Sequence, residues 1–437
     1  MNQSIAIARP VIEQIYAAAL AAADPRLAVR CAIVLDNRTI TIAGRSFGPE
    51  TAVVIVAIGK AAVTMAQGAL DVLGDRVIRG IAITKDGHSN GVVLPGIEMY
   101  EASHPIPDER GVRATQRAIE FVESCGPNEI VLALISGGGS ALFESPELPV
   151  TLEDMATVTG LLLRAGAAIE ELNAVRTPLS QVKGGGMLRR AARTELVTLI
   201  VSDVLGNDPR VIASGPTVPG NRDASRARQV LERFGLWDSV PDSVRDVLGR
   251  DLNVDIAVSD SNRLAVIADN RSAIEAAQKK AELLGLRSET IWIDRTGEAR
   301  EQASFWVAEC LETSAEIDCL IGGGELTVTV TGEGVGGRNT EFVLAAVQEL
   351  HASSNHDWVI ASIATDGQDG PTGVAGGFLT ADSIDELIEL GVDPSASIAD
   401  NDTLAPLRTL GGVIEPGPTG TNVNDLFLAI RINALNR

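Results

Sequence analysis

Short apolar runs alternate with longer stretches of helical periodicity along almost the whole chain, and this alternation limits the folds open to it. An apolar run of about four to eight residues is typical of a buried strand, and strands separated by helices form βαβ units. Such units assemble into a mainly parallel sheet covered by helices, so we predict an α/β fold. The expected strands are Val53–Ile58, Gly80–Thr84, Ile97–Glu101, Ile130–Ile135, Leu196–Ser202, Leu264–Ala268, Thr290–Ile293, Ile317–Ile321, Leu326–Thr331 and Trp358–Ala364.

Most of these runs end in a polar or glycine-rich motif, among them "AIGK", "ISGGGS", "VSDVLGND" and "ATDGQDG". In open α/β sheets, ligands bind beyond the carboxyl ends of the strands. We therefore expect the functional residues to gather at one edge of a sheet.

A chain of 437 residues is too long for one ordinary hydrophobic core, which indicates two domains. The stretch 237–258 is acidic, is punctuated by Pro and Gly, and separates two blocks of α/β pattern. We place the boundary there and expect domains over 1–250 and 251–437. The N-terminal 25 residues have helical spacing of apolar residues but no basic leader or cleavage site, so they predict a domain helix rather than a signal peptide.

The composition and net charge of the chain limit the kinds of molecule that it can bind. Apolar residues make up 45% and charged residues 22%, as in a soluble globular protein. The net charge of −22 repels phosphate backbones, so we expect neither nucleic acid nor a membrane as a partner, and a small anionic ligand needs a local basic patch. The four cysteines lack metal-site spacing and predict reduced core thiols in a cytoplasmic protein without zinc. The sequence leaves open whether the chain forms a homo-oligomer.

Two similar glycine runs follow predicted strands, one in "ISGGGS" and one in "IGGGE". Without Cβ atoms a polyanion can approach the main chain, where free N–H groups converge on it. Tight turns or close packing are the alternative explanation, and a third run, "KGGGM" at 183–187, weighs against it. The predicted phosphate-binding residues are Ser136, Gly137, Gly138, Gly139, Ser140, Gly322, Gly323, Gly324 and Glu325.

Two basic residues are placed where they would attract negative charge. Lys60 stands where a strand meets a helix, and Arg338 stands at or just before a helix N-terminus. Asn339, the residue after Arg338, is a further predicted nucleotide- or phosphate-binding residue. An arginine can fork onto phosphate or carboxylate oxygens, whereas a solvated lysine and a surface ion pair are the structural alternatives. No stretch fits a P-loop. The segment Gly332–Gly337 matches G-x-G-x-x-G, but the acidic ribose partner expected about 20 residues later is missing, so this match is weak.

Two acidic loops follow strands, one with Asp203 and Asp208 and the other with Asp366 and Asp369. Magnesium takes one or two carboxylates beside substrate phosphates, so Asp203, Asp366 and Asp369 are predicted metal ligands. Aspartates in such loops are also ordinary turn formers.

Two further segments carry polar side chains, one after the predicted strand 97–101 and the other ahead of an apolar run near the C-terminus. His104 lies in "ASHPIPDERG", which is either a substrate contact or a structural loop, and Asn424 lies in "GPTGTNVNDL", which is either a turn with a helix cap or part of the site.

The ordered motifs of the chain resemble those of the class II glycerate kinases, the glycerate 2-kinases with a C-terminal MOFRL domain that are often labelled hydroxypyruvate reductases. The resemblance spans nearly the whole chain. The motifs that carry it are "ISGGGSALF", "TPLSQVKGGGM", "VSDVLGNDPRVIASGPTV", "GGGELTVTVTGEGVGGRNTEF", "ATDGQDGPTGVAGG" and "GTNVNDL".

This resemblance implies ATP-dependent, Mg²⁺-supported phosphorylation of D-glycerate to 2-phosphoglycerate. It also implies a Rossmann-like N-terminal domain, a smaller C-terminal α/β domain and an active site in the interdomain cleft. Lys60 and Arg338 match the family's catalytic cations. The chain has Asn207 where family members commonly have Asp, which leaves the role of Asp208 open.

Phosphoryl transfer needs positioning and charge neutralisation, so we expect the glycine runs and the two cations to hold the ATP phosphates. Asp203 is the predicted catalytic carboxylate, although Asp366 is an alternative for orienting the nucleophile, and the predicted acceptor contacts are His104, Asp208 and Asn424. Two other functions stay open. One is an NAD(P)H-dependent hydroxypyruvate reductase, and the other is a nucleotide-binding regulatory module without catalysis.

Overall fold

The computed structural model describes residues 3–36, 39–89, 91–220, 222–250, 252 and 262–435. The chain forms two compact units, a central unit (Pro25–Ile267) and a terminal unit (Met1–Asp24 with Ala268–Arg437) that contains both chain ends. The expected boundary after residue 250 borders residues outside the described ranges. The observed division differs from it, because the units separate after Ile267 and the N-terminal segment belongs with the second unit.

The N-terminal helix α1 (Gln3–Ala22) explains this division. Its buried residues include Ile5, Ile12 and Ile15. It packs against α11 (Asn270–Leu283) and against the strands β12 (Trp358–Ala364) and β13 (Gly376–Thr380) of the terminal unit. In the described part of the chain it is the one helix long and apolar enough to cross a membrane. Its packing inside a unit agrees with the expected domain helix.

The central unit contains a six-stranded sheet in which the neighbours from β6 to β8 pair in parallel. The inner strands β4, β7 and β8 are buried on both faces and are therefore nearly continuous apolar runs, which made them predictable from the sequence. In the order of the sheet, the strands are β6 (Ile97–Ala102), β5 (Val77–Lys85), β4 (Ala52–Ile58), β7 (Glu129–Ile135), β8 (Glu195–Val201) and β9 (Arg263–Ala268).

Helices cover both faces of this sheet. On one face, α4 (Glu109–Glu123) and α8 (Gly186–Arg190) share a buried core with Val54, Val56 and Ile58. A separate helix, α3 (Ala62–Leu73), contacts β4, β5 and β7. Because successive side chains of a strand point to opposite faces, Val53, Ile55 and Ala57 face away from the α4 core.

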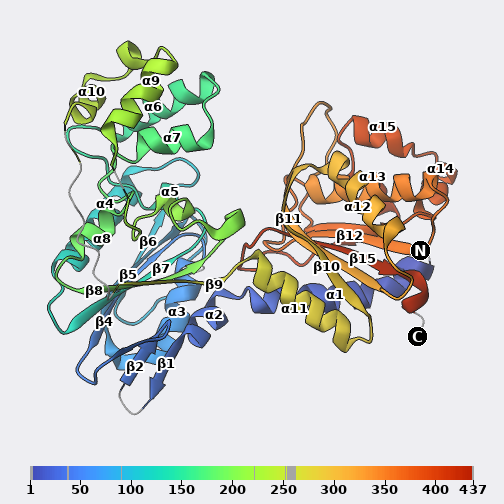
Figure 1. Cartoon of the computed structure of the whole chain (residues 1–437), viewed down its shortest axis with the longest axis horizontal. Coiled ribbons are helices and arrows are strands. Elements are labelled where there is room, and N and C mark those ends of the chain that lie inside the picture. The colour runs from blue at the N-terminus through green and yellow to red at the C-terminus, as the bar shows by residue number, and fades with distance from the viewer. Residues whose placement is uncertain are drawn as a thin grey trace. The chain divides into compact units, whose positions relative to one another are not determined.

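A helical group with its own apolar core stands beyond the sheet of the central unit (Figure 1). It contains α6 (Leu152–Arg164), α7 (Ile169–Arg176), α9 (Ala224–Arg233) and α10 (Asp242–Leu248). The unit also contains the short helices α2 (Pro25–Ala32) and α5 (Gly139–Leu142) and a small antiparallel sheet of β1 (Ile33–Asp36), β2 (Thr39–Ile42) and β3 (Arg45–Phe47).

The terminal unit has a mixed sheet. Only β10 and β11 pair in parallel, and the remaining neighbours are antiparallel. α1 and α11 cover one face, and α12 (Ala299–Glu312) and α13 (Arg338–Ala352) cover the other (Figure 1). In the order of the sheet, the strands are β10 (Ser288–Glu298), β11 (Cys319–Thr327), β15 (Asp425–Arg431), β12 (Trp358–Ala364), β13 (Gly376–Thr380) and β14 (Val413–Ile414), and the short helices α14 (Ser383–Glu389), α15 (Pro394–Ala399) and α16 (Leu404–Thr409) complete the unit.

The antiparallel register decides which loops of the terminal unit meet. Asp425, the first residue of β15, pairs with Gly324 of β11 on one side and with Ala364, the last residue of β12, on the other. The segments after Ala364 and before Asp425 therefore lie at the same place on the sheet. This is where the polar residues of the unit gather.

One part of the strand prediction is wrong. The runs 317–321 and 326–331 were expected to be separate strands with a glycine loop between them, but β11 is a single strand and Gly322–Gly324 lie inside it. The thiols also differ in part, since Cys125, Cys310 and Cys319 are free and buried as expected, whereas Cys31 is exposed.

Candidate functional site

In the central unit, the carboxyl ends of β4 and β7 are joined by backbone hydrogen bonds. The Lys60 amide donates to the Gly137 carbonyl (2.9 Å), and the Ser136 amide donates to the Ile58 carbonyl (2.9 Å). Gly59 has φ +113°, and a methyl group on it would lie 2.4 Å from Ser136 Oγ. The close approach of these two strand ends therefore requires glycine there, and it places Lys60 beside the predicted phosphate loop.

Asp203 and His104 complete this group of residues. A Cβ atom on Gly137 would lie 2.0 Å from Asp203 Oδ2, and one on Gly138 would lie 3.1 Å from His104 Cδ2. Side chains from the ends of β6, β4, β7 and β8 thus meet at one edge of the parallel sheet, as the sequence predicted. Among the described residues the Lys60 ammonium makes no hydrogen bond, and it makes no ion pair within 4.0 Å.

The surroundings of Asp203 and His104 shift the pKa of each side chain. Burial raises the pKa of Asp203, against the opposing effect of Lys60. Burial lowers the pKa of His104, and the charges of Lys60 and Lys85 lower it further. At neutral pH the imidazole is therefore uncharged, while the Asp203 carboxyl holds its proton to a higher pH than an exposed aspartate does.

The far end of the glycine loop is held by a buried ion pair that the sequence analysis missed. Lys183 Nζ donates to the Ser140 carbonyl (2.6 Å) and lies 3.2 Å from Glu144 Oε2, with both charged side chains 1% exposed. Ser140 Oγ lies 2.8 Å from Ser214 Oγ. The motif "KGGGM" draws attention in the sequence by its glycines, yet its lysine is the residue that reaches the predicted phosphate loop.

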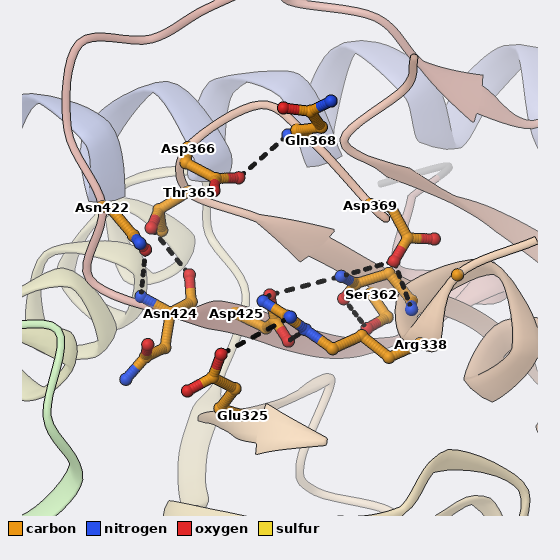
Figure 2. A network of polar contacts seen from close by, with 12 residues as sticks. Glu325, Arg338, Ser362, Thr365, Asp366, Gln368, Asp369, Asn422, Asn424 and Asp425 are labelled. Atoms are coloured by element: carbon orange, nitrogen blue, oxygen red, sulfur yellow. Dashed lines mark hydrogen bonds and ion pairs between the residues drawn. The ribbon is translucent and has the colours of Figure 1, made fainter. Parts of the chain in front are cut away.

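In the terminal unit, Arg338 is locked into an ion pair with Asp425 (Figure 2). Arg338 Nε and Nη2 donate to the two oxygens of Asp425 at 2.6 and 3.0 Å, and Nη1 lies 3.5 Å from Glu325 Oε1. Burial by itself lowers the pKa of Arg338, but Asp425 and Glu325 outweigh it and raise the pKa. Arg338 is therefore a fixed, permanently charged group.

Asp369 does not fit its predicted role as a metal ligand. Its carboxylate caps the start of α13, where it accepts hydrogen bonds from the Asn339 amide (2.9 Å) and the Thr340 amide (2.9 Å), and it also accepts from Asn339 Nδ2 and Thr340 Oγ1. Four donors occupy its two oxygens. This capping is favourable because the first amides of a helix lack partners within the helix.

Asn339 is also part of this buried scaffold. Its Nδ2 donates to Asp369 and to Asp425 Oδ1, and its Oδ1 accepts from Ser362. The side chain links the cap of α13 to the partner of Arg338. Its predicted contact with phosphate has no support in this arrangement, because both ends of the amide are already bonded within the unit.

Asp366 and Asn424 lie beside this scaffold on the adjoining loops (Figure 2). One Asp366 oxygen accepts from the Gln368 amide (2.9 Å), and the other takes no hydrogen bond from the described residues. Asn424 has φ +66°, and its carbonyl accepts from Thr365 Oγ1 (2.6 Å) and from the Thr365 amide. The two loops are thereby tied together, with the Asp366 carboxylate available to a ligand.

The glycines of the second run have a packing role. Cβ atoms on them would lie 2.8 Å from Trp292 Cβ, 2.2 Å from Asn270 Oδ1 and 2.1 Å from the Arg295 carbonyl oxygen, in the order Gly322, Gly323, Gly324. Their main chain is shared with β10 on one side and β15 on the other. Because strand pairing occupies this main chain, the predicted phosphate cradle is not formed at Gly322–Gly324, and close packing explains these residues.

Asp208 pairs with Arg210 and, in the described part of the chain, makes no hydrogen bond or ion pair with Lys60, His104 or Asp203. It accepts hydrogen bonds from the Arg210 amide, Nε and Nη2, and this arginine lowers the pKa of Asp208. The pair is local and largely exposed, so its geometry indicates a turn rather than a substrate contact.

The carboxylates of the described residues suit Mg²⁺ only where a nucleotide shares the ion. Among the described residues, no group of three or more His, Cys, Asp or Glu side chains is placed to hold a metal ion. Mg²⁺ usually keeps several waters and needs only one or two carboxylates beside substrate phosphates. Asp366, with one oxygen available, fits that requirement, and so does Asp203, whose carboxyl makes no side-chain hydrogen bond among the described residues.

The comparisons with known proteins agree with this two-unit α/β architecture. A family model described as a domain of unknown function (DUF4147) matches residues 11–249, and the MOFRL family model matches residues 318–425. These two models, together with relatives that are 38% identical over almost the whole chain, show that the chain belongs to the MOFRL family of glycerate kinases.

Individual relatives cover almost the full length. The glycerate 2-kinase of Pyrococcus horikoshii is 38% identical over 424 residues, which is 94% of each chain. A relative from Agrobacterium vitis, also 38% identical and covering 96% of this chain and 93% of its own, carries hydroxypyruvate reductase as a provisional name. The solved structure of glycerate kinase from Thermotoga maritima matches with a TM-score of 0.87 at 35% identity, over 97% of this chain and 99% of that one.

Proposed function

We propose that this chain is a glycerate 2-kinase, which transfers the γ-phosphoryl group of ATP to the 2-hydroxyl of D-glycerate. The observation that carries the proposal is the 38% identity to a glycerate 2-kinase over 94% of both chains. The structure supports it with two clusters, each of which presents a cation beside a carboxylate.

In the central unit, Lys60 and the loop Ser136–Ser140 bind the ATP phosphates. The supporting observation is that the Lys60 ammonium has no partner among the described residues while its main chain is fixed against Gly137. A positioned cation of this kind stabilises the negative charge on the phosphoryl group in the transition state of the transfer. Phosphoryl transfer depends on the positioning of the reactants more than on covalent chemistry by the protein.

Asp203 accepts the proton of the attacking hydroxyl. Its raised pKa brings the carboxylate closer to the basicity that general-base catalysis requires. His104 is uncharged and lies against the loop at Gly138, and its imidazole forms a hydrogen bond with the bound glycerate.

In the terminal unit, Arg338 supplies the second positive charge, and Asp425 and Glu325 fix its orientation. Asp366 is the carboxylate in this unit that would hold Mg²⁺ together with the nucleotide. Asp203 is the alternative ligand in the central unit, but a carboxylate that holds Mg²⁺ would not also accept the hydroxyl proton, so we assign Asp203 to the proton and Asp366 to the ion. When bound, the ion neutralises phosphate charge. Asn424 holds the loop of Asp366 in place through its carbonyl.

The reductase alternative is disfavoured by the packing of its G-x-G-x-x-G segment. Cβ atoms on Gly332, Gly334 and Gly336 would collide with the turn 400–403, at 2.3 Å from the Asp400 carbonyl oxygen, 2.4 Å from Asp402 Cβ and 2.3 Å from Thr403 Oγ1. These glycines make room for the protein's own chain, so the segment gives no support for a dinucleotide site.

The test is an assay with D-glycerate and magnesium-ATP, in which we expect glycerate-dependent formation of ADP. Phosphorus NMR of the product should show 2-phosphoglycerate and not 3-phosphoglycerate. A parallel reaction with NAD(P)H and hydroxypyruvate should leave the nicotinamide absorbance unchanged. Nucleotide binding without ADP formation would instead support the regulatory module, and oxidation of NAD(P)H would support the reductase.

We further propose that the protein acts in the cytoplasm on small molecules alone. The net charge of −22 and the free cysteines support this. Light scattering would establish whether the chain is a monomer or a homo-oligomer. Retention on a phospholipid or DNA column at low salt would contradict the proposed absence of such partners.

A further inference from the structure

A cavity of about 290 Å³ lies in the central unit, beside the loop that follows β6. Its walls are mostly apolar. Pro105, Ile106 and Pro107 form one side, and Leu152 and Met155 of α6 are among the residues of the other. None of these residues has a role in the proposed transfer reaction.

Two charged residues line the cavity, Glu144 and Arg176. The charge of Glu144 is already balanced, because its Oε2 forms an ion pair with Lys183 Nζ at 3.2 Å, although without hydrogen-bond geometry, and its Oε1 accepts from the Ser145 amide and the Ser180 hydroxyl. The Thr159 hydroxyl, also in the lining, donates to the Met155 carbonyl (2.7 Å). Neither group is left to bind a ligand strongly.

Arg176 is different. Its side chain is partly buried, and among the described residues it makes no hydrogen bond and no ion pair within 4.0 Å. Since Lys183 already neutralises Glu144, the charge of Arg176 is unbalanced. A guanidinium offers several N–H donors in a planar fork, and it pairs with a carboxylate through two parallel hydrogen bonds.

The walls also limit what else the ligand contains. A hydroxyl group buried without a hydrogen-bond partner loses its bonds to water without replacement, which weakens binding. Glycerate has two hydroxyl groups in addition to its carboxylate, and the apolar walls have few groups that could bond to them. The cavity therefore suits an acid with an apolar body better than it suits the proposed acceptor.

We propose that this cavity binds a small monocarboxylate, with its carboxylate forked onto Arg176 and its apolar body against α6. The site is separate from the residues assigned to phosphoryl transfer, and the binding itself does not depend on the proposed kinase function.

The site has a structural route to the predicted phosphate loop. Arg176 lies close enough to Lys183 for its charge to lower the pKa of Lys183, in addition to the larger effect of burial. Lys183 in turn donates to the Ser140 carbonyl. A bound carboxylate would neutralise Arg176 and strengthen the charged form of Lys183, so we expect tighter holding of the loop and a lower KM for ATP. This consequence, unlike the binding, rests on the proposed function.

The experiment is calorimetric titration of the full chain with benzoate and with benzamide, its neutral counterpart of similar shape. We expect benzoate to bind at least about tenfold more tightly than benzamide, which corresponds to about 1.4 kcal/mol for the charge-assisted pair. Arg176→Gln should abolish this preference. Arg193→Gln, which removes an exposed arginine of the same unit, should leave it unchanged.

A second variant keeps the test decisive. Thr159→Phe fills part of the cavity and should weaken both probes, and retention of the thermal midpoint will show that each variant is folded. Equal benzoate affinity in the wild type and in Arg176→Gln would overturn the proposal. So would displacement of benzoate by D-glycerate, since the cavity would then belong to the acceptor site. An unchanged KM for ATP with benzoate bound would refute the link to the loop.

Discussion

The two glycine runs at 137–139 and 322–324 look alike in the sequence but have different roles in the structure. The first forms a loop after β7, in which Gly138 has φ +82° and the glycines contact Lys60, His104 and Asp203. The second lies inside β11, where the missing side chains make room for Trp292, Asn270 and the backbone of Arg295. Three glycines after an apolar run therefore predict a close approach, but not what approaches.

Lys60 and Arg338, the two predicted catalytic cations, differ in whether the protein itself already binds their charge. Lys60 has no ion pair among the described residues, whereas Arg338 shares two hydrogen bonds with the fully buried Asp425. The central unit presents an available charge on a fixed backbone, and the terminal unit presents a charge already built into its core. Mutations at matched positions should therefore affect activity in both units but stability in only one.

The largest expected effect is at the two cations. Both Lys60→Met and Arg338→Met should lower kcat by about 10³-fold or more, the size seen when a charge that stabilises phosphoryl transfer is lost. Only Arg338→Met should also destabilise the fold, by about 3 kcal/mol, because Asp425 is left buried without its partner. Steady-state kinetics and denaturant unfolding measure the two effects separately.

The double variant Arg338→Met with Asp425→Asn serves as the control for this pair. It removes the orphaned charge, so it should recover most of the stability and none of the activity. If Arg338→Met unfolded no more easily than Lys60→Met, the ion pair would not hold the terminal unit together, and the contrast between the units would be lost.

The next effect is at the glycines themselves. Gly137→Ala should lower kcat/KM by about 10²-fold with little loss of stability, because its methyl group displaces the Asp203 carboxyl from the proposed reaction site. Gly323→Ala should instead destabilise the fold by about 1–3 kcal/mol through overpacking against Asn270 and Ile274. Its folded fraction should have nearly wild-type kcat. If Gly137→Ala lost stability and Gly323→Ala lost activity, the first run would be the packing element and the second would belong to the reaction site.

The sequence predicted the central unit well because a parallel sheet obeys simple rules. Its inner strands β4, β7 and β8 are nearly continuous apolar runs, and the carboxyl ends of its parallel strands share one edge. The positions of Lys60, His104, Ser136 and Asp203 could therefore be inferred to be close without knowing the sheet order. The small sheet β1–β3 escaped because its strands have only three or four residues.

The terminal unit was harder to predict because its strands run in both directions. The role of Asp425 depends on antiparallel register between segments about a hundred residues apart, which no local pattern encodes. Asp369 was assigned to a metal because a helix cap supplied by a distant loop has the same local sequence as an acidic ligand loop. The buried Lys183 was missed because its partner Glu144 stands in an apolar stretch with no motif of its own.

The smallest expected effect concerns the stability contributed by Asp203. Burial raises its pKa, so the folded state holds the proton more tightly than the unfolded chain does. Stability from this group is therefore fully present below the unfolded-state pKa and is lost as the pH rises through the folded-state pKa. Above that pH the ionised carboxylate costs stability, and Asp203→Asn should raise the denaturation midpoint slightly while lowering kcat.

The difference in midpoint should shrink on acidification, because the wild-type carboxyl then becomes neutral. Asp208→Asn is the matched control, since Arg210 lowers the pKa of Asp208 and gives the opposite sign. That pair is largely exposed, so solvent should reduce its effect nearly to zero. If Asp203→Asn lowered the midpoint at neutral pH and the loss disappeared in acid, attraction to Lys60 would outweigh burial, and Lys60 would not be the available charge on which the contrast between the units rests.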